Sequence, residues 1–179
     1  MPPTPNLRQA VRAVILDPDD RVLLVRWRFP EHDVWGTPGG GIDAGEEPYD
    51  ALRRELLEET GLDLHDPSVA LTGCVAHRMH LFPMSSGHDG QEEHYYLVRA
   101  AAFEPRGRLN AEELRAENVE ELRWWSVPEL VRCLGDAPDA AEGPSRGSRR
   151  VVCAPRALPS LLAGWLAEGP PAQMVELAV

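Results

Sequence analysis

The sequence has few cysteines: Cys74, Cys133 and Cys153 are the only three among its 179 residues, and no two form a CxxC pair. An odd number of widely separated cysteines argues against a disulfide framework and against a thiolate zinc site. Long apolar runs are also missing, which argues against a signal peptide and a transmembrane helix. The expected setting is therefore the cytoplasm, with reduced thiols and no membrane partner.

Positive charge is scarce as well. There are 18 Lys and Arg residues against 29 Asp and Glu, which gives a formal net charge of −11. Such a surface repels nucleic acid, and no long basic run reverses the sign locally, so no nucleic-acid partner is expected. An acidic protein that handles phosphates is expected to hold them through a metal cation.

The length and the 43% hydrophobic content fit a single domain with one core. Short strands outnumber helices in the pattern, and several form hairpins, which favours a mixed sheet packed between helices. The expected core covers about 8–133, followed by a loop or linker at 134–150, a helix region at 151–168 and a tail at 169–179. Strands are expected at 11–16, 22–27, 69–80, 94–103 and 121–126, a loop at 29–45, and short helices at 127–133 and 158–167.

A glycine-rich loop leads directly into a further helix. Three consecutive glycines at 39–41 let the backbone approach a metal ion or a phosphate closely. Pro48 suits the first turn of the helix, and Gly61 suits its C-terminal cap. The sequence therefore predicts a phosphate-metal site where the loop meets the helix.

The helix carries three carboxylates on one face. Glu55, Glu58 and Glu59 lie at i, i+3 and i+4, which places their Cβ atoms within about 6 Å of one another. Arg54 supplies one positive charge and cannot balance all three. Oxygen ligands at this density suit Mg²⁺, with Mn²⁺ as a substitute.

These residues closely resemble the Nudix box, G-x5-E-x7-R-E-U-x-E-E-x-G-U, where U is apolar. All seven fixed identities are present, a coincidence expected about once in a million chains. The resemblance implies an α/β (α+β) fold, a Nudix-type α/β/α sandwich with a mixed, partly antiparallel sheet. The matching positions are Gly40, Glu46, Arg54, Glu55, Leu56, Glu58, Glu59, Gly61 and Leu62.

The resemblance also implies a reaction and a role for each residue. The family hydrolyses nucleoside diphosphates linked to another group, by attack of water on phosphorus with Mg²⁺ bound. Glu58 and Glu59 would be the principal metal ligands, and Glu55 would be a third ligand or the base that activates water. The carbonyl of Gly40 would complete the shell, and Arg54 would orient a glutamate.

The base can also lie outside the box. Glu117 and Glu93 rank first as bases, ahead of Glu92 and Glu120, as loop residues that could swing toward the metals. Each of these carboxylates, taken alone, is more simply a solvated surface group. The histidines at 77, 80, 88 and 94 form no H-x-x-x-H pair on a helix, so no zinc site is expected from them.

Two alternatives stay open. One is a pyrophosphatase that removes damaged nucleoside triphosphates, and the other is a catalytically silent Nudix domain that senses a nucleotide. The complete set of box glutamates favours an enzyme. Some subfamilies carry a proline or a tyrosine roughly fifteen to eighteen positions past the box, where this chain has His77–His80. The substrate is therefore expected to be a small nucleotide of unspecified kind, and the resemblance is compatible with a homodimer.

Overall fold

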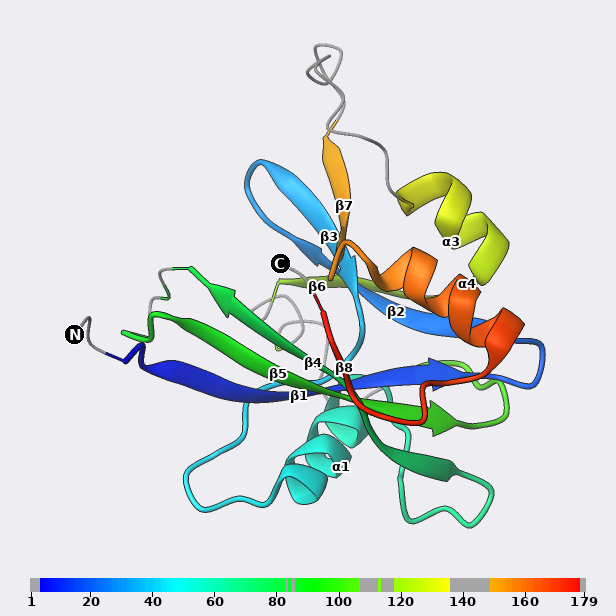
Figure 1. Cartoon of the computed structure of the whole chain (residues 1–179), viewed down its shortest axis with the longest axis horizontal. Coiled ribbons are helices and arrows are strands. Elements are labelled where there is room, and N and C mark those ends of the chain that lie inside the picture. The colour runs from blue at the N-terminus through cyan, green and yellow to red at the C-terminus, as the bar shows by residue number, and fades with distance from the viewer. Residues whose placement is uncertain are drawn as a thin grey trace.

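The computed structural model describes residues 4–82, 84, 86–106, 113, 118–135 and 149–177. Its centre is a mixed eight-stranded sheet in the order β7-β3-β2-β1-β5-β4-β8, with β6 paired to β2 (Figure 1). The strands are β1 (Leu7–Leu16), β2 (Arg21–Arg28), β3 (His32–Gly36), β4 (Ala70–Leu81), β5 (Gly90–Arg99), β6 (Val119–Ser126), β7 (Arg150–Ala154) and β8 (Val175–Glu176).

Helices cover both faces of this sheet. Successive residues of β1 point to opposite faces, because side chains alternate along a strand. Val11, Ala13 and Ile15 pack in one core cluster with α1 (Pro48–Glu59). Val14 and Leu16 pack in the other with α3 (Val127–Leu134) and α4 (Leu158–Glu168). Figure 1 shows α1 apart from the α3–α4 pair. The expected α/β/α arrangement with a mixed sheet is confirmed.

Most of the expected elements are present with small shifts at their ends. The hairpin of β1 and β2 is antiparallel, as predicted. Its turn is stabilised by Asp17, whose Oδ1 accepts hydrogen bonds from the backbone N–H groups of Asp19 at 3.0 Å and Arg21 at 2.8 Å. The predicted acidic helix is confirmed as α1: Pro48 lies in its first turn, and Gly61 follows its end with a φ of 80°.

Three strands were not expected. β3 lies within the segment predicted to be a loop, and it pairs in parallel with β7, which follows the linker. β8 lies in the predicted tail and pairs in parallel with β4. The C-terminal segment therefore adds a strand to each end of the sheet, which the hydrophobic pattern did not indicate. Within the described residues, no helix is both long and apolar enough to cross a membrane.

The sheet opens between β1 and β2, and this opening places the glycine loop. The two strands pair near their turn, at Ile15 with Leu23 and Leu16 with Val22. Further from the turn, β1 instead meets the glycine loop, through an antiparallel bridge between Ala10 and Gly41. The loop therefore runs beside a rigid strand of the central sheet.

Candidate active site

The glycine loop is held in an extended conformation against β1. Hydrogen bonds join Ala13 N–H to the Pro38 carbonyl, Val11 N–H to the Gly40 carbonyl and Ile42 N–H to the carbonyl of Gln9, each at 2.9 Å. The loop runs so close to β1 that little room is left for side chains. Gly39 has a φ of 128°, and a Cβ on it would lie 2.2 Å from the carbonyl oxygen of Val11. Glycine is therefore required at position 39 by both backbone conformation and space.

Two glutamates of α1 contact this loop directly. The carboxylate of Glu59 is buried, with 4% of the residue exposed, and its Oε2 accepts a hydrogen bond from Gly39 N–H at 2.8 Å. The carboxylate of Glu55 lies against Gly40, where a Cβ would be 2.4 to 2.6 Å from its atoms. The helix and the loop thus form one surface, on which Glu58 is the most exposed of the three carboxylates, with 39% of its side chain accessible.

Arg54 joins the loop, the helix start and two of these carboxylates. Its guanidinium donates to both oxygens of Glu46, at 2.8 and 3.0 Å, and to the Gly41 carbonyl at 3.0 Å. It also donates to Glu55 at 2.8 Å and lies 3.6 Å from Glu58. Its hydrogen bonds, together with the N–H of Asp43, lower the pKa of Glu46 to about 2. One guanidinium is therefore shared among four carboxylates, since the Asp43 carboxylate also lies 3.8 Å from Arg54 Nη2.

The donor set of the box residues fits a hard divalent cation, because its donor atoms are all oxygens. Glu55 and Glu58 are incompletely neutralised, and the Gly40 carbonyl keeps a second lone pair beside its bond to Val11. The three box carboxylates do not converge on one point here, because Glu59 points to Gly39 and Glu55 to Arg54. Among the described residues, the only three donors within 4.8 Å of one another belong to His77, Glu92 and His94.

Glu93 occupies a very different environment. It is 5% exposed, and its Oε1 accepts hydrogen bonds from Arg12 Nε and Gln91 Nε2, each at 2.9 Å. Its Oε2 accepts from Tyr95 Oη at 2.9 Å and from Arg78 Nη1 at 3.3 Å. Burial opposes ionisation of this carboxylate, but the charges of the two arginines outweigh it, and the pKa of Glu93 is lowered. A carboxylate with four donors on two oxygens is a weak proton acceptor.

Arg12 connects Glu93 to the glycine loop. Beside its bond to Glu93, its Nη1 donates to the Gly39 carbonyl, while the N–H of Gly39 donates to Glu59. Burial alone would lower the pKa of Arg12, but the charges of Glu93 and Glu59 help to raise it above its usual value. Gly39 is therefore fixed on both sides of its backbone by charged side chains, one of which is itself fixed by Glu93.

The other sequence candidates lie elsewhere. Glu117 lies outside the described residues. Glu120 lies in β6 and forms an ion pair with Arg28 at 3.0 Å. Glu92 lies beside His77 and His94, so the strand pairing assembles a group of metal-binding side chains that helical spacing did not indicate. Sequence reasoning missed Arg12 and Arg78, since only the register of β1, β4 and β5 brings them to Glu93.

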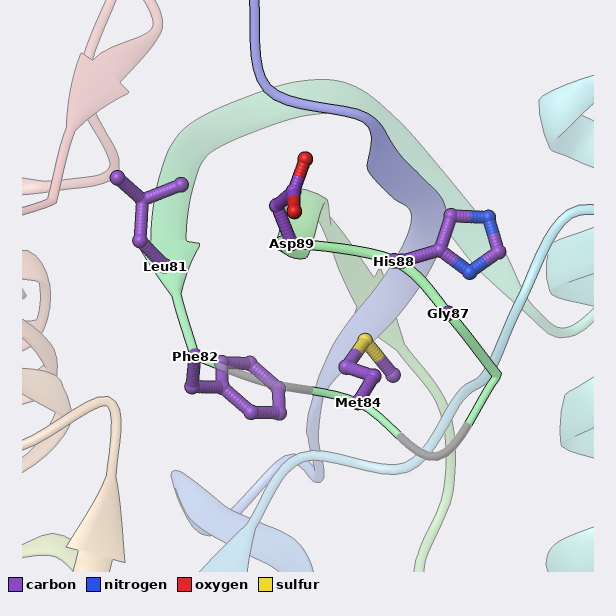
Figure 2. A pocket seen from close by; sticks show the side chains of 6 residues that line it. All are labelled: Leu81, Phe82, Met84, Gly87, His88 and Asp89. Atoms are coloured by element: carbon purple, nitrogen blue, oxygen red, sulfur yellow. The ribbon is translucent and has the colours of Figure 1, made fainter.

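A pocket is present at the connection between β4 and β5, but it holds none of the box residues. Figure 2 shows its lining side chains, which come from the end of β4 and the segment that follows it. Asp89 is its only lining carboxylate, and it accepts a hydrogen bond from the Asn6 N–H at 2.7 Å. The lining residues are Leu81, Phe82, Met84, Gly87, His88 and Asp89. The candidate active site is therefore the surface formed by the glycine loop and α1.

Comparison with known proteins gives a consistent result. Residues 6–146 match the NUDIX domain family. The chain is 36% identical over 100 residues to an RNA pyrophosphohydrolase of Helicobacter pylori strain G27, a match that covers 51% of this chain and 63% of that protein. It is 33% identical over 136 residues to an RNA pyrophosphohydrolase of Sulfurovum sp. strain NBC37-1, covering 71% of this chain and 82% of the relative.

A solved structure shares the fold. The MutT NUDIX hydrolase from Burkholderia pseudomallei is 29% identical, with a TM-score of 0.50, and the match covers 69% of this chain and 85% of that one. The chain spans a little under two thirds of the length of the first relative. The family match nonetheless extends over most of the chain and includes the whole box. The chain is a member of the Nudix family.

Proposed function

We propose that the chain is a Mg²⁺-dependent hydrolase that cleaves a phosphoanhydride bond in a nucleoside diphosphate linked to another group. Water attacks one phosphorus atom, the bond to the bridging oxygen breaks, and the products are a nucleoside monophosphate and a phosphorylated second group. The observation that carries this proposal is the contact of Glu55 with Gly40, next to the partly exposed Glu58. Carboxylates that Arg54 neutralises only in part therefore lie beside the backbone of the glycine loop.

Each box residue has a role in this proposal. Glu58 and Glu59 hold the cation together with the Gly40 carbonyl. When bound, Mg²⁺ would neutralise the charge that develops on the phosphate oxygens. Glu55 is the third ligand or accepts the proton of the attacking water, and Arg54 keeps Glu55 in place through its 2.8 Å hydrogen bond. The variant Glu55→Gln separates the two roles. It weakens Mn²⁺ binding if Glu55 is a ligand, and it lowers only turnover if Glu55 accepts the proton of water.

Arg8 is the residue best placed to bind a substrate phosphate. A Cβ on Gly41 would lie 2.3 Å from its guanidinium, so Arg8 borders the glycine loop. Among the described residues, Arg8 donates a hydrogen bond to the neutral amide oxygen of Gln91, at 3.3 Å. A guanidinium paired with an amide rather than a carboxylate keeps its charge available for a phosphate. Arg8 thus supplies a positive charge for the phosphate in an otherwise acidic protein.

The relatives widen the range of substrates to be tested. Their name, RNA pyrophosphohydrolase, refers to action on RNA. The expectation of no nucleic-acid partner therefore stays a prediction, and so does the cytoplasmic setting. A triphosphate-bearing RNA end and a small nucleotide present the same phosphoanhydride chemistry to the site, and they differ in what lies beyond the phosphates.

A panel of nucleotides with Mg²⁺ tests the proposal. It contains nucleoside diphosphate sugars, dinucleoside polyphosphates, nucleoside triphosphates and a 5′-triphosphorylated RNA, with phosphate, pyrophosphate and nucleotide products measured. We expect turnover of at least one substrate, loss of that turnover in Glu58→Gln, and a raised KM in Arg8→Ala. Glu168→Gln, at the exposed end of α4, is the matched control and keeps full activity. Binding of a nucleotide without any turnover by the wild type would instead support a silent sensing domain.

A further inference from the structure

A second cluster of metal-binding side chains lies on β4 and β5, outside the proposed active site. His77 of β4 is directly opposite His94 of β5, and Glu92 is two residues before His94. Residues opposite each other and residues two apart along a strand share one face of a sheet. One donor atom from each of the three side chains lies within 4.8 Å of the other two.

His77 already lies close to each of the other two side chains. His77 Nε2 lies 2.9 Å from Glu92 Oε1, and the ring centroids of His77 and His94 are 5.1 Å apart. All three residues are half-buried, so they are partly withdrawn from water but remain accessible to an ion. The other oxygen of Glu92 accepts a hydrogen bond from Gln9 Nε2 at 2.7 Å. Gln9 thus fixes the orientation of the carboxylate, as outer-sphere residues do in metal sites.

We propose that His77, Glu92 and His94 form a zinc site, with water as the fourth ligand. Two imidazole nitrogens and one carboxylate oxygen are a ligand set that Zn²⁺ accepts in tetrahedral geometry. In that geometry the donor atoms lie about 3.4 Å apart. The His77–Glu92 pair is already this close, and rotation of the His94 side chain closes the remaining gap. The oxygen-only ligands of α1 favour Mg²⁺, so the two sites differ in the metal they select.

The proposed site joins neighbouring strands of the sheet. Its ligands connect β4 to β5, and Gln9 extends the connection to β1. The backbone carbonyl of Gln9 also accepts the hydrogen bond of Ile42 N–H at 2.9 Å, just after the glycine loop. Bound Zn²⁺ therefore stabilises the part of the sheet that supports the glycine loop.

Titration of the metal-free full-length chain with Zn²⁺ alone, in competition with a chromogenic chelator, tests the proposal. We expect one tight Zn²⁺ equivalent and a Tm higher by several degrees when it is bound. His94→Ala and the isosteric Glu92→Gln should weaken binding about a hundredfold or more. His65→Ala, an exposed histidine stacked near Tyr49, is the matched control and should bind as the wild type does.

Two further measurements separate this site from the box and from misfolding. Glu58→Gln should keep its Zn²⁺ affinity, whereas loss of Zn²⁺ binding in this variant would assign the ion to α1 and overturn the proposal. Co²⁺ in place of Zn²⁺ should give the strong visible absorption of a four-coordinate site in the wild type and lose it in Glu92→Gln. Absence of Zn²⁺ binding by the wild type, or binding as tight as that of the wild type by His94→Ala and Glu92→Gln, would also overturn it.

Discussion

Glu58 and Glu93 are the same residue type in opposite surroundings. Glu93 is buried beneath two arginines, a tyrosine and a glutamine, and each of its oxygens accepts two hydrogen bonds. The side chain of Glu58 is 39% exposed and shares the guanidinium of Arg54, 3.6 Å away, with the carboxylates of Asp43, Glu46 and Glu55. A buried carboxylate needs full compensation to stay charged, whereas a partly exposed one can remain incompletely neutralised.

We attribute the difference to two roles, stability for Glu93 and the proposed metal binding for Glu55 and Glu58. Complete pairing makes Glu93 a fixed element that holds Arg12, and Arg12 in turn holds the Gly39 carbonyl. Incomplete pairing leaves Glu58 and Glu55 able to exchange Arg54 for a cation. We therefore expect substitutions of Glu93 to affect folding first and substitutions of Glu58 to affect catalysis alone.

The largest effect is expected for Glu58→Gln. Loss of a metal ligand should lower kcat/KM on the order of a thousandfold, equivalent to about 4 kcal/mol of transition-state stabilisation. The unfolding free energy should change by less than about 0.5 kcal/mol, because the side chain is at the surface. Steady-state kinetics with Mg²⁺ and urea unfolding measure the two quantities, with Glu168→Gln as control. An equal loss of kcat/KM in Glu58→Gln and Glu168→Gln would show that the effect is not specific to Glu58.

Glu93→Gln should affect stability more than catalysis, the reverse of Glu58→Gln. It leaves the buried Arg78 and the half-buried Arg12 without their anion, so the unfolding free energy should fall by about 3 kcal/mol. Urea unfolding measures this change. The sequence placed Glu93 among the candidate bases. If Glu93→Gln kept the stability of the wild type but its pH–rate profile no longer showed the ionisation of a catalytic base, the result would support Glu93 as the base. It would contradict the structural role.

Gly39→Ala and Gly40→Ala form a matched pair within the loop. At Gly39, the positive φ and the Val11 carbonyl 2.2 Å from a new Cβ should cost about 2 kcal/mol or more of stability. At Gly40, the three atoms nearest to a new Cβ all belong to the end of the Glu55 side chain, which can move away. Gly40→Ala should therefore fold normally and lose about tenfold or more in turnover, because Glu55 is displaced. Thermal unfolding and kinetics separate the two variants. Similar stability losses would show that the loop, rather than Glu55, is disturbed at both positions.

The smallest effect is expected at Glu46, and it depends on pH. Its pKa is lowered from an ordinary value of 4.5 to about 2 by Arg54 and the Asp43 N–H. A lowered folded-state pKa gives stability that is complete above pH 4.5 and is lost as the pH falls toward 2. The Tm difference between wild type and Glu46→Gln should therefore be constant above about pH 5 and shrink in acid. A difference that grows on acidification would contradict the ion pair.

The sequence predicted elements whose signals are local. Pro48, Gly61 and the spacing of the three glutamates set the bounds of α1 and its acidic face, because caps and side-chain spacing act within one helix. The hairpin of β1 and β2 followed in the same way from the turn at Asp17. The family resemblance, rather than periodicity, gave the roles of the box residues, and those roles stay predictions.

Features that depend on pairing between distant segments were not predictable. β3 lies among Pro30, Gly36 and Pro38, which indicate a loop, and it forms a strand because β7 pairs with it from more than a hundred residues away. His77 faces His94 only through the register of β4, which contains two irregularities before it reaches this point. A periodic pattern indicates which side a residue faces, but not which residue lies opposite.

Mn²⁺ binding tests the central claim most directly, namely that the carboxylates of α1 and the glycine loop together hold a divalent cation. Free Mn²⁺ is measured by its electron paramagnetic resonance signal, with a non-hydrolysable nucleoside diphosphate analogue present, for the wild type and for Glu58→Gln. We predict that the wild type depletes the signal and that Glu58→Gln, still folded, leaves it close to the protein-free value. Undiminished signal with the wild type, or equal depletion by both proteins, would contradict the account.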